Sequence, residues 1–226
     1  MAIAAHPGDG MFTMGAVLAG HIESGGSGVL LSLSLGEKGA PKNIAVPQYG
    51  AMQRTATEKA AGLIGAKSIF FDYPDAEIPF NEESSLRVCD VIREQQPDVV
   101  VTHWSGSWHK DHQNCHLIVR DAIFYAGLGT LTRNRPPYAV SKIFYAENWE
   151  DATNFAPDTY IDIAPVYQKW LEACDCYPMW RGQTGFFRYN DYYSSLSVMR
   201  GCLSGFSHAA ALMSDVNQRT QRIQTL

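Results

Sequence analysis

The sequence predicts an α/β fold, a Rossmann-like three-layer sandwich around a mostly parallel central sheet. Short apolar runs alternate with segments whose apolar residues recur at helical spacing, which is typical of βαβ units. The run at residues 99–102 is apolar without a break, as expected of a parallel strand covered on both faces. At 226 residues, with 46% hydrophobic side chains, the chain can bury a large core.

In the first part of the chain, each expected strand is followed by an expected helix. The strands cover residues 2–5, 29–35, 68–71 and 99–102. Helical spacing of apolar residues follows each of them, over residues 14–22, 52–64, 88–92 and 115–126. Glycines or a proline end the first three of these helices. Helices that alternate with strands in this way connect parallel strands.

The last third of the chain is less regular. It contains two candidate strands at residues 141–145 and 159–163, and a candidate helix at 165–176. Residues 177–193 are crowded with aromatic side chains. These rings either form a lid or a stacking wall for a sugar, or pack in the core or at a subunit interface.

We expect a single domain over residues 1–226, with a Rossmann-like core at 1–128 and elements at 129–226 that complete it and line the site. The net charge is −5 and no run of Lys or Arg is present, which argues against a nucleic-acid or membrane partner. No stretch approaches the roughly 18 apolar residues of a membrane span. The N-terminus lacks the basic segment of a signal peptide. Five cysteines without zinc-finger spacing indicate reduced thiols in a cytoplasmic protein.

Two clusters of possible metal ligands follow predicted strands. The first is His6 with Asp9, and the second contains His109, Asp111, His112 and His116. Residues just past the carboxyl ends of parallel strands converge on one crevice, where ligands bind. Two imidazoles and a carboxylate suit one divalent metal with open positions, which can turn water into a nucleophile near neutral pH. The alternative is that these residues are helix caps and surface histidines.

The motifs in these clusters resemble a known family. The sequence reads AHPGD at residues 5–9 and HKDH at residues 109–112, and further similarity runs through residues 36–39, 63–65, 73–75, 97–100, Asp162-Ile163 and Arg200-Gly201. On these motifs the sequence resembles the LmbE-like, or PIG-L, family of zinc-dependent N-deacetylases. The resemblance implies a Rossmann-like fold, one zinc ion and a small-molecule substrate, namely a sugar-derived or related N-acyl amide. It also implies a homo-oligomer.

The resemblance implies a role for several individual residues. The zinc ligands of the family fall on His6, Asp9 and His112. The histidine that stabilises the tetrahedral intermediate, and that would protonate the leaving amine, falls on His109. Asp111 would then be a neighbouring carboxylate that fixes the tautomer of an imidazole.

One position departs from the family pattern. The family motif has Asp, the general base, where this sequence has Gly8. A general base contributes about 10²–10⁴-fold to a rate, so hydrolysis should be weaker unless another group substitutes. The candidates are Asp75, Asp111, His109 and Glu37, and we favour His109 first and Glu37 second.

The same departure keeps two other functions open. Members of the superfamily that resemble 4-oxalomesaconate hydratase also lack this Asp and keep the metal ligands. The chain could therefore be a metal-dependent hydratase of an unsaturated oxo-carboxylic acid. It could also be a metal-binding protein without catalysis.

Overall fold

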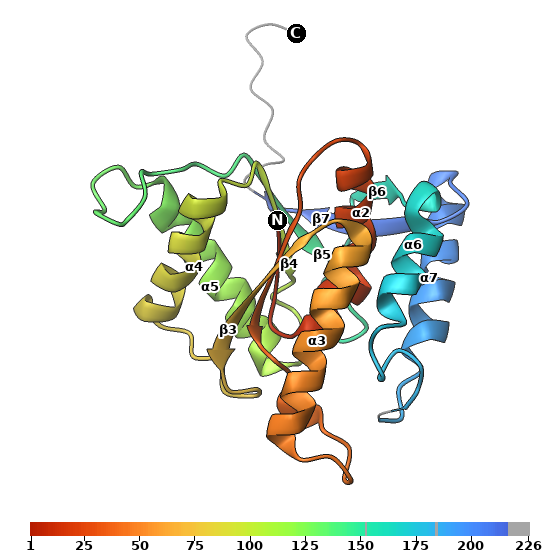
Figure 1. Cartoon of the computed structure of the whole chain (residues 1–226). Helices are drawn as coiled ribbons and strands as arrows, with labels where there is room; N and C mark the ends of the chain where they lie inside the picture. The colour runs from red at the N-terminus through yellow and green to blue at the C-terminus, as the bar shows by residue number, and fades with distance from the viewer. Residues whose placement is uncertain (152, 184, 217–226) are drawn as a thin grey trace, which may run out of the picture.

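A computed structural model of the protein describes residues 1–151, 153–183 and 185–216. Seven strands form one sheet in the order β3-β2-β1-β4-β5-β7-β6 (Figure 1). Neighbouring strands from β3 to β5 are all parallel, and β7 is antiparallel to both β5 and β6. The strands are β1 (Ala2–Ala4), β2 (Val29–Ser34), β3 (Lys67–Tyr73), β4 (Val99–His103), β5 (Lys142–Ala146), β6 (Thr159–Asp162) and β7 (Ala209–Ser214). The predicted α/β class and mostly parallel sheet are confirmed.

Helices cover both faces of this sheet (Figure 1). Helices α2, α3, α6 and α7 pack on one face, and α4 and α5 pack on the other. The helices are α1 (Pro7–Asp9), α2 (Gly15–Glu23), α3 (Val46–Ile64), α4 (Glu82–Gln95), α5 (Lys110–Gly127), α6 (Tyr167–Cys174) and α7 (Tyr189–Ser204). Three shorter turns are a π-helical η1 (Gly10–Met14) and the 3₁₀ segments η2 (Glu37–Gly39) and η3 (Ala164–Val166).

Strand β1 illustrates why the strands have continuous apolar sequences. Ala2 and Ala4 belong to the core on the α2 face, whereas Ile3 and the following Ala5 belong to the core on the α5 face. Successive side chains of a strand point to opposite faces, so a strand between two helical layers buries all of them. The chain leaves β1 in the middle of the sheet, with β2 on one side and β4 on the other. This is the topological switch point, at which α/β sheets form their ligand crevice.

The C-terminal third contains two elements, the helix α7 and the strand β7, for which the sequence analysis made no prediction. Helix α7 buries Tyr193, Ser197 and Gly201, which are four residues apart but include only one large apolar side chain. Gly201 has no room for a side chain, because a Cβ atom there would lie 2.7 Å from the carbonyl oxygen of Phe206. Small and polar residues at the buried positions hide the helical pattern that the prediction relies on.

The buried guanidinium of Arg93 fixes the end of α5. Arg93 is 1% exposed and donates to five backbone carbonyls, those of Tyr125, Ala126, Leu128, Leu131 and Arg135. The last carbonyls of a helix have no partner within the helix, so a cation at this end satisfies them and interacts favourably with the helix dipole. Within the residues described, no helix is both long and apolar enough to cross a membrane.

Candidate metal centre

The turn after β1 presents the first two predicted ligands. His6 has an extended backbone and is the N-cap of α1, Pro7 begins that helix, and Asp9 lies in its first turn. The following turn lies so close to the sheet that a Cβ atom on Gly10 would come within 2.5 Å of Leu30. Glycine at position 10 therefore allows the turn to sit on the sheet and hold His6 and Asp9 over its edge.

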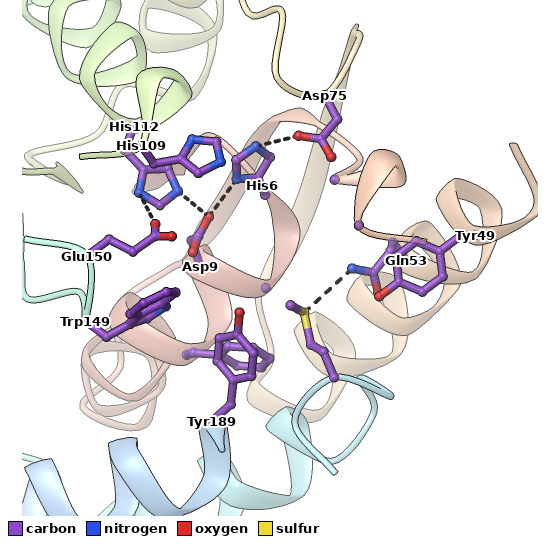
Figure 2. Close-up of a pocket in the computed structure, with 15 residues that line it drawn as sticks. His6, Asp9, Tyr49, Gln53, Asp75, His109, His112, Trp149, Glu150 and Tyr189 are labelled. Atoms are coloured by element: carbon purple, nitrogen blue, oxygen red, sulfur yellow. Dashed lines mark hydrogen bonds and ion pairs between the residues drawn. The ribbon is translucent and has the colours of Figure 1, made fainter. Parts of the chain in front are cut away.

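The three predicted ligands converge on one point (Figure 2). Asp9 Oδ2 lies 2.9 Å from His6 Nδ1 and 2.9 Å from His112 Nε2. The donor atoms of the three side chains all lie within 4.8 Å of one another. Burial acts to raise the pKa of Asp9, but the charges and hydrogen bonds of His112 and His6 outweigh it and hold the pKa well below its ordinary value.

The second nitrogen of His6 is held by carboxylates. His6 Nε2 donates to Asp75 Oδ1 at 3.0 Å and to Asp111 Oδ2 at 3.2 Å. Asp111 is fully buried, and it also accepts the backbone N–H groups of Ala76 and Ile78. With the Nε2 proton fixed in this way, Nδ1 is the nitrogen of His6 that can bind a metal. The sequence analysis expected Asp111 to fix the tautomer of an imidazole, and it contacts Nε2 of His6.

A second set of donor atoms, from His6, His109 and Asp111, also lies within 4.8 Å. It uses the nitrogen of His6 that already donates to two carboxylates, and the carboxylate of Asp111 that already accepts two backbone N–H groups. A metal there would displace these contacts, so the set of His6, Asp9 and His112 is the better candidate.

His112 is oriented from two directions. Its Nδ1 lies 3.0 Å from Glu150 Oε2 and 3.2 Å from Ser107 Oγ. Its ring stacks on the buried ring of His103, with 4.0 Å between centroids and 15° between planes. His103 in turn accepts the backbone N–H of Ala5 through Nε2 at 3.0 Å. The partner atoms on Nδ1 and the stacked ring leave Nε2 of His112 pointing at Asp9.

His109 lies beside the two ligand rings and begins α5. Its ring centroid is 5.0 Å from that of His6 and 4.6 Å from that of His112. Nδ1 of His109 accepts the backbone N–H of Asp111, so the side chain is the N-cap of α5 and the proton of the neutral ring resides on Nε2. Burial and the neighbouring His112 lower the pKa of His109. The last histidine of the second cluster, His116, donates from Nδ1 to the backbone carbonyl oxygen of His103 at 3.0 Å and lies apart from the ligand set.

Glu37 occupies a different place from the one predicted for a catalytic group. Its Oε1 accepts the backbone N–H of Asp75 at 2.9 Å, and Asp75 accepts the backbone N–H of Lys38 in return. These two bonds join the η2 turn to the segment after β3. Asp75 lines the pocket and Glu37 does not. The hydrogen bond from His6 outweighs the opposing effect of burial and lowers the pKa of Asp75.

A pocket with a volume of about 160 Å³ opens beside the ligand set. Figure 2 shows Glu150, Asp9 and the ligand histidines close together, with Trp149 beside Glu150, Tyr189 below them and Tyr49 farther away on the right. The apolar and aromatic part of its lining is Phe12, Tyr49, Trp149, Met179 and Tyr189. Of the aromatic stretch at 177–193, Tyr177, Trp180 and Tyr193 are buried in the core, and Tyr189 lies at the pocket. The stretch is therefore divided: these three rings pack in the core, as one of the two interpretations expected, whereas Phe186 is 92% exposed.

Two residues of the site, Asn148 and Glu150, are missing from the sequence analysis. Both follow β5, which is parallel to β1 and β4 and ends at the same edge of the sheet. Residues just past the carboxyl ends of parallel strands converge on one crevice, and this rule also points to the polar residues after the candidate strand at 141–145. Burial and the nearby Asp9 raise the pKa of Glu150 to about 8.

The residues present fit a divalent metal. Two imidazole nitrogens and a carboxylate oxygen are the ligand types of catalytic metal sites that keep open positions for water and substrate. The other nitrogen of each ligand histidine has a hydrogen-bond partner on the protein, Asp111 for His6 and Ser107 for His112, which is typical of metal-binding histidines. His6, Asp9 and His112 therefore have the features of a metal centre.

Comparison with known proteins agrees with this description. A sequence profile of the PIG-L family, described as GlcNAc-PI de-N-acetylase, matches residues 1–123. The chain is 26% identical over 215 residues to 4-oxalmesaconate hydratase from Pseudomonas putida, a match that covers 89% of this chain and 79% of the hydratase.

Solved structures share the fold. A 4-carboxy-2-hydroxymuconate hydratase from Pseudomonas putida superposes with a TM-score of 0.87 at 21% identity, over 100% of this chain and 97% of that one. An N,N'-diacetylchitobiose deacetylase from Pyrococcus horikoshii superposes with a TM-score of 0.80 at 19% identity, over 95% of this chain and 82% of that one. Deacetylases and hydratases thus share one architecture. Because the family profile spans more than half of the chain, this protein belongs to the PIG-L family of enzymes.

Proposed function

We propose that the protein is a zinc-dependent amide hydrolase that removes an acyl group, such as acetyl, from a small neutral amide. The observation that carries this proposal is the charge of the pocket. Asp9, Asp75 and Glu150 line it, and among the described residues no Lys or Arg does. A neutral amide, such as an N-acetylated sugar, can enter a pocket of this kind without a cationic partner. Its small volume suits the acyl group and the atoms next to it.

The protein groups of the pocket suit hydrolysis of an amide. When bound, zinc supplies Lewis-acid activation of a carbonyl group and of water. His109 would donate its Nε2 proton in a hydrogen bond to the carbonyl oxygen as negative charge develops there, because its Nδ1 already accepts the N–H of Asp111. Trp149 and Tyr189 would exclude water and hold the remainder of the substrate.

The position of the general base remains glycine. Gly8 lines the pocket, but it has no group that can accept a proton. Neither substitute that we favoured is placed for this task, since His109 Nδ1 accepts a backbone N–H and Glu37 does not line the pocket. We therefore expect slow hydrolysis that relies on the ion, with a rate below that of an enzyme with a carboxylate at this position.

Hydration of an unsaturated carboxylic acid is a second candidate. It is supported by the similarity to 4-oxalmesaconate hydratase and by the glycine at position 8. A mesaconate or a muconate carries at least two carboxylates, which would face the carboxylates of Asp9 and Asp75 in the pocket. The described part of the lining has no Lys or Arg to offset this repulsion, so we place hydration second.

The zinc-loaded protein, assayed on two substrate panels, distinguishes the candidates. Acetate release from N-acetylglucosamine derivatives and other N-acyl amides, abolished by a chelator and restored by zinc, would support the hydrolase. Loss of ultraviolet absorbance from conjugated oxo-dicarboxylic acids, with no acetate release, would replace it by the hydratase. A protein that binds zinc and acts on neither panel would contradict both candidates.

A further inference from the structure

The segment after β5 contacts the side chains of two metal ligands. Asn148 Nδ2 donates to Asp9 Oδ1 at 3.2 Å, and Glu150 Oε2 lies 3.0 Å from His112 Nδ1. Asn148 is 4% exposed and Glu150 is 7% exposed. We propose that residues 148–151 form a clamp on the metal centre, in which Asn148 positions Asp9 and Glu150 positions His112. This proposal depends on the metal site of the proposed function and on none of its substrates.

The hydrogen bonds around Asn148 fix the direction of its side-chain amide. Asn148 Oδ1 lies 3.2 Å from the backbone nitrogen of Glu150 and 3.3 Å from the hydroxyl of Tyr193. A backbone N–H can only donate, so the atom that faces it must be the oxygen of the amide. The NH₂ group must then face Asp9. Asp151 holds the same turn, because its Oδ2 accepts the backbone N–H of Asn148 at 2.8 Å.

The two oxygens of Asp9 therefore have separate partners. Oδ2 lies between the nitrogens of His6 and His112, and Oδ1 accepts a hydrogen bond from Asn148. With Oδ1 held by Asn148, Asp9 offers a metal one oxygen rather than two. A carboxylate that binds through one oxygen leaves a further coordination position for water or substrate.

Glu150 acts on the ring of His112 from the opposite side. Nδ1 of His112 lies 3.0 Å from Glu150 Oε2 and 3.2 Å from Ser107 Oγ, so a ring proton on Nδ1 leaves Nε2 unprotonated and directed at Asp9. Such outer carboxylates set the tautomer and the ring orientation of a metal-binding histidine, and their removal typically weakens metal binding about 10–100-fold. Both positioning residues come from one segment, so a single loop sets the geometry of two ligands.

Zinc affinity and the spectrum of the cobalt-substituted protein test the clamp without any substrate. We would replace Glu150 by Met, which keeps the length of the side chain and removes the acceptor, and by Gln, which keeps an acceptor oxygen. We would replace Asn148 by Leu, which removes the donor at similar volume. The matched control is Glu147→Ala, because Glu147 lies in the same segment and pairs with Arg200 rather than with a ligand.

In chelator competition we expect zinc to bind about 10–100-fold more weakly to Glu150→Met, and within about threefold of the unmodified protein to Glu150→Gln. In Asn148→Leu, Asp9 gains a second free oxygen, so cobalt(II) should gain coordination and its visible absorption should weaken. Glu147→Ala should lower the stability to urea and leave zinc affinity unchanged.

Three results would overturn the clamp. In the first, Glu150→Met and Asn148→Leu bind zinc like the unmodified protein with the same cobalt spectrum. In the second, Glu147→Ala weakens zinc binding as much as they do, which would show a general effect of packing. In the third, Glu150→Gln loses as much affinity as Glu150→Met. If one apolar variant fails to fold, the other still tests its own half of the clamp against Glu147→Ala. A protein that binds zinc normally but releases no acetate would contradict the proposed function alone.

Discussion

Restoring a carboxylate at position 8 tests the proposed chemistry most directly. A Cβ atom on Gly8 would lie 3.0 Å from Met179 Sδ and 3.3 Å from Phe12 Cε2. The sulfur belongs to a flexible side chain, whereas Phe12 is 4% exposed and packed among other rings. Gly8→Asp alone should therefore cost about 1–3 kcal/mol of folding stability through overpacking. Removing the sulfur in the double variant Gly8→Asp with Met179→Ala should recover part of this loss.

A positioned base is worth about 10²–10⁴-fold, or about 3–5 kcal/mol in activation free energy. Because crowding opposes the gain, we expect acetate release by the single variant to rise about tenfold in kcat/KM, and the double variant to exceed it. The assay is acetate release by zinc-loaded protein, with urea unfolding and zinc content measured on the same samples and Met179→Ala alone as the control. If the double variant is folded and zinc-loaded but hydrolyses amides more slowly than Met179→Ala, the reasoning about position 8 is wrong.

Three further predictions concern stability and metal content. Arg93→Met leaves five buried carbonyls without their donor and should lower the free energy of unfolding in urea by about 3 kcal/mol or more. The control Arg133→Met loses a more exposed ion pair with Asp90 and should cost under about 1 kcal/mol. Equal losses would contradict the role of Arg93 at the end of α5. Burial raises the pKa of Asp151 from 3.8 to about 7, so the folded state keeps a proton that the unfolded chain releases, and stability falls between about pH 4 and pH 7 by at most about 4 kcal/mol. Asp151→Asn should flatten the stability profile over that interval, and an unchanged slope would refute this. Zinc at 100 times its Kd should stabilise the protein by about 2.7 kcal/mol, so chelation should lower Tm and zinc should restore it; a Tm that is indifferent to zinc would argue against the site.

The sequence predicts most of the N-terminal half, because there the physical signals are local. Residues 99–102 are apolar since β4 is buried on both faces, and Gly65 ends α3 in a left-handed conformation that glycine adopts easily. The helix starts were less accurate. Helix α3 begins at Val46 rather than near Met52, since its first turns carry Pro, Gln and Gly instead of a regular apolar stripe.

The partners around the site are harder to predict, because they depend on tertiary contacts between distant segments. His6 and Asp111 are 105 residues apart, and Asn148 reaches Asp9 across 139 residues. Motif spacing locates the ligands, since each follows a strand. It does not reveal that Glu37 binds the backbone of Asp75, or that His103 stacks under His112. These contacts follow from the shape of loops, which short-range patterns do not encode.

The chain order of the pocket has an evolutionary consequence. The three ligand side chains all precede residue 113, whereas Met179 and Tyr189 of the apolar lining follow residue 151. Mutations at Met179 and Tyr189, which lie outside the clamp, can reshape the cavity while the metal site stays intact. Evolution can therefore keep the metal site and change the substrate that fits the pocket. This separation offers a physical route by which amide cleavage and water addition could diverge from one ancestral scaffold.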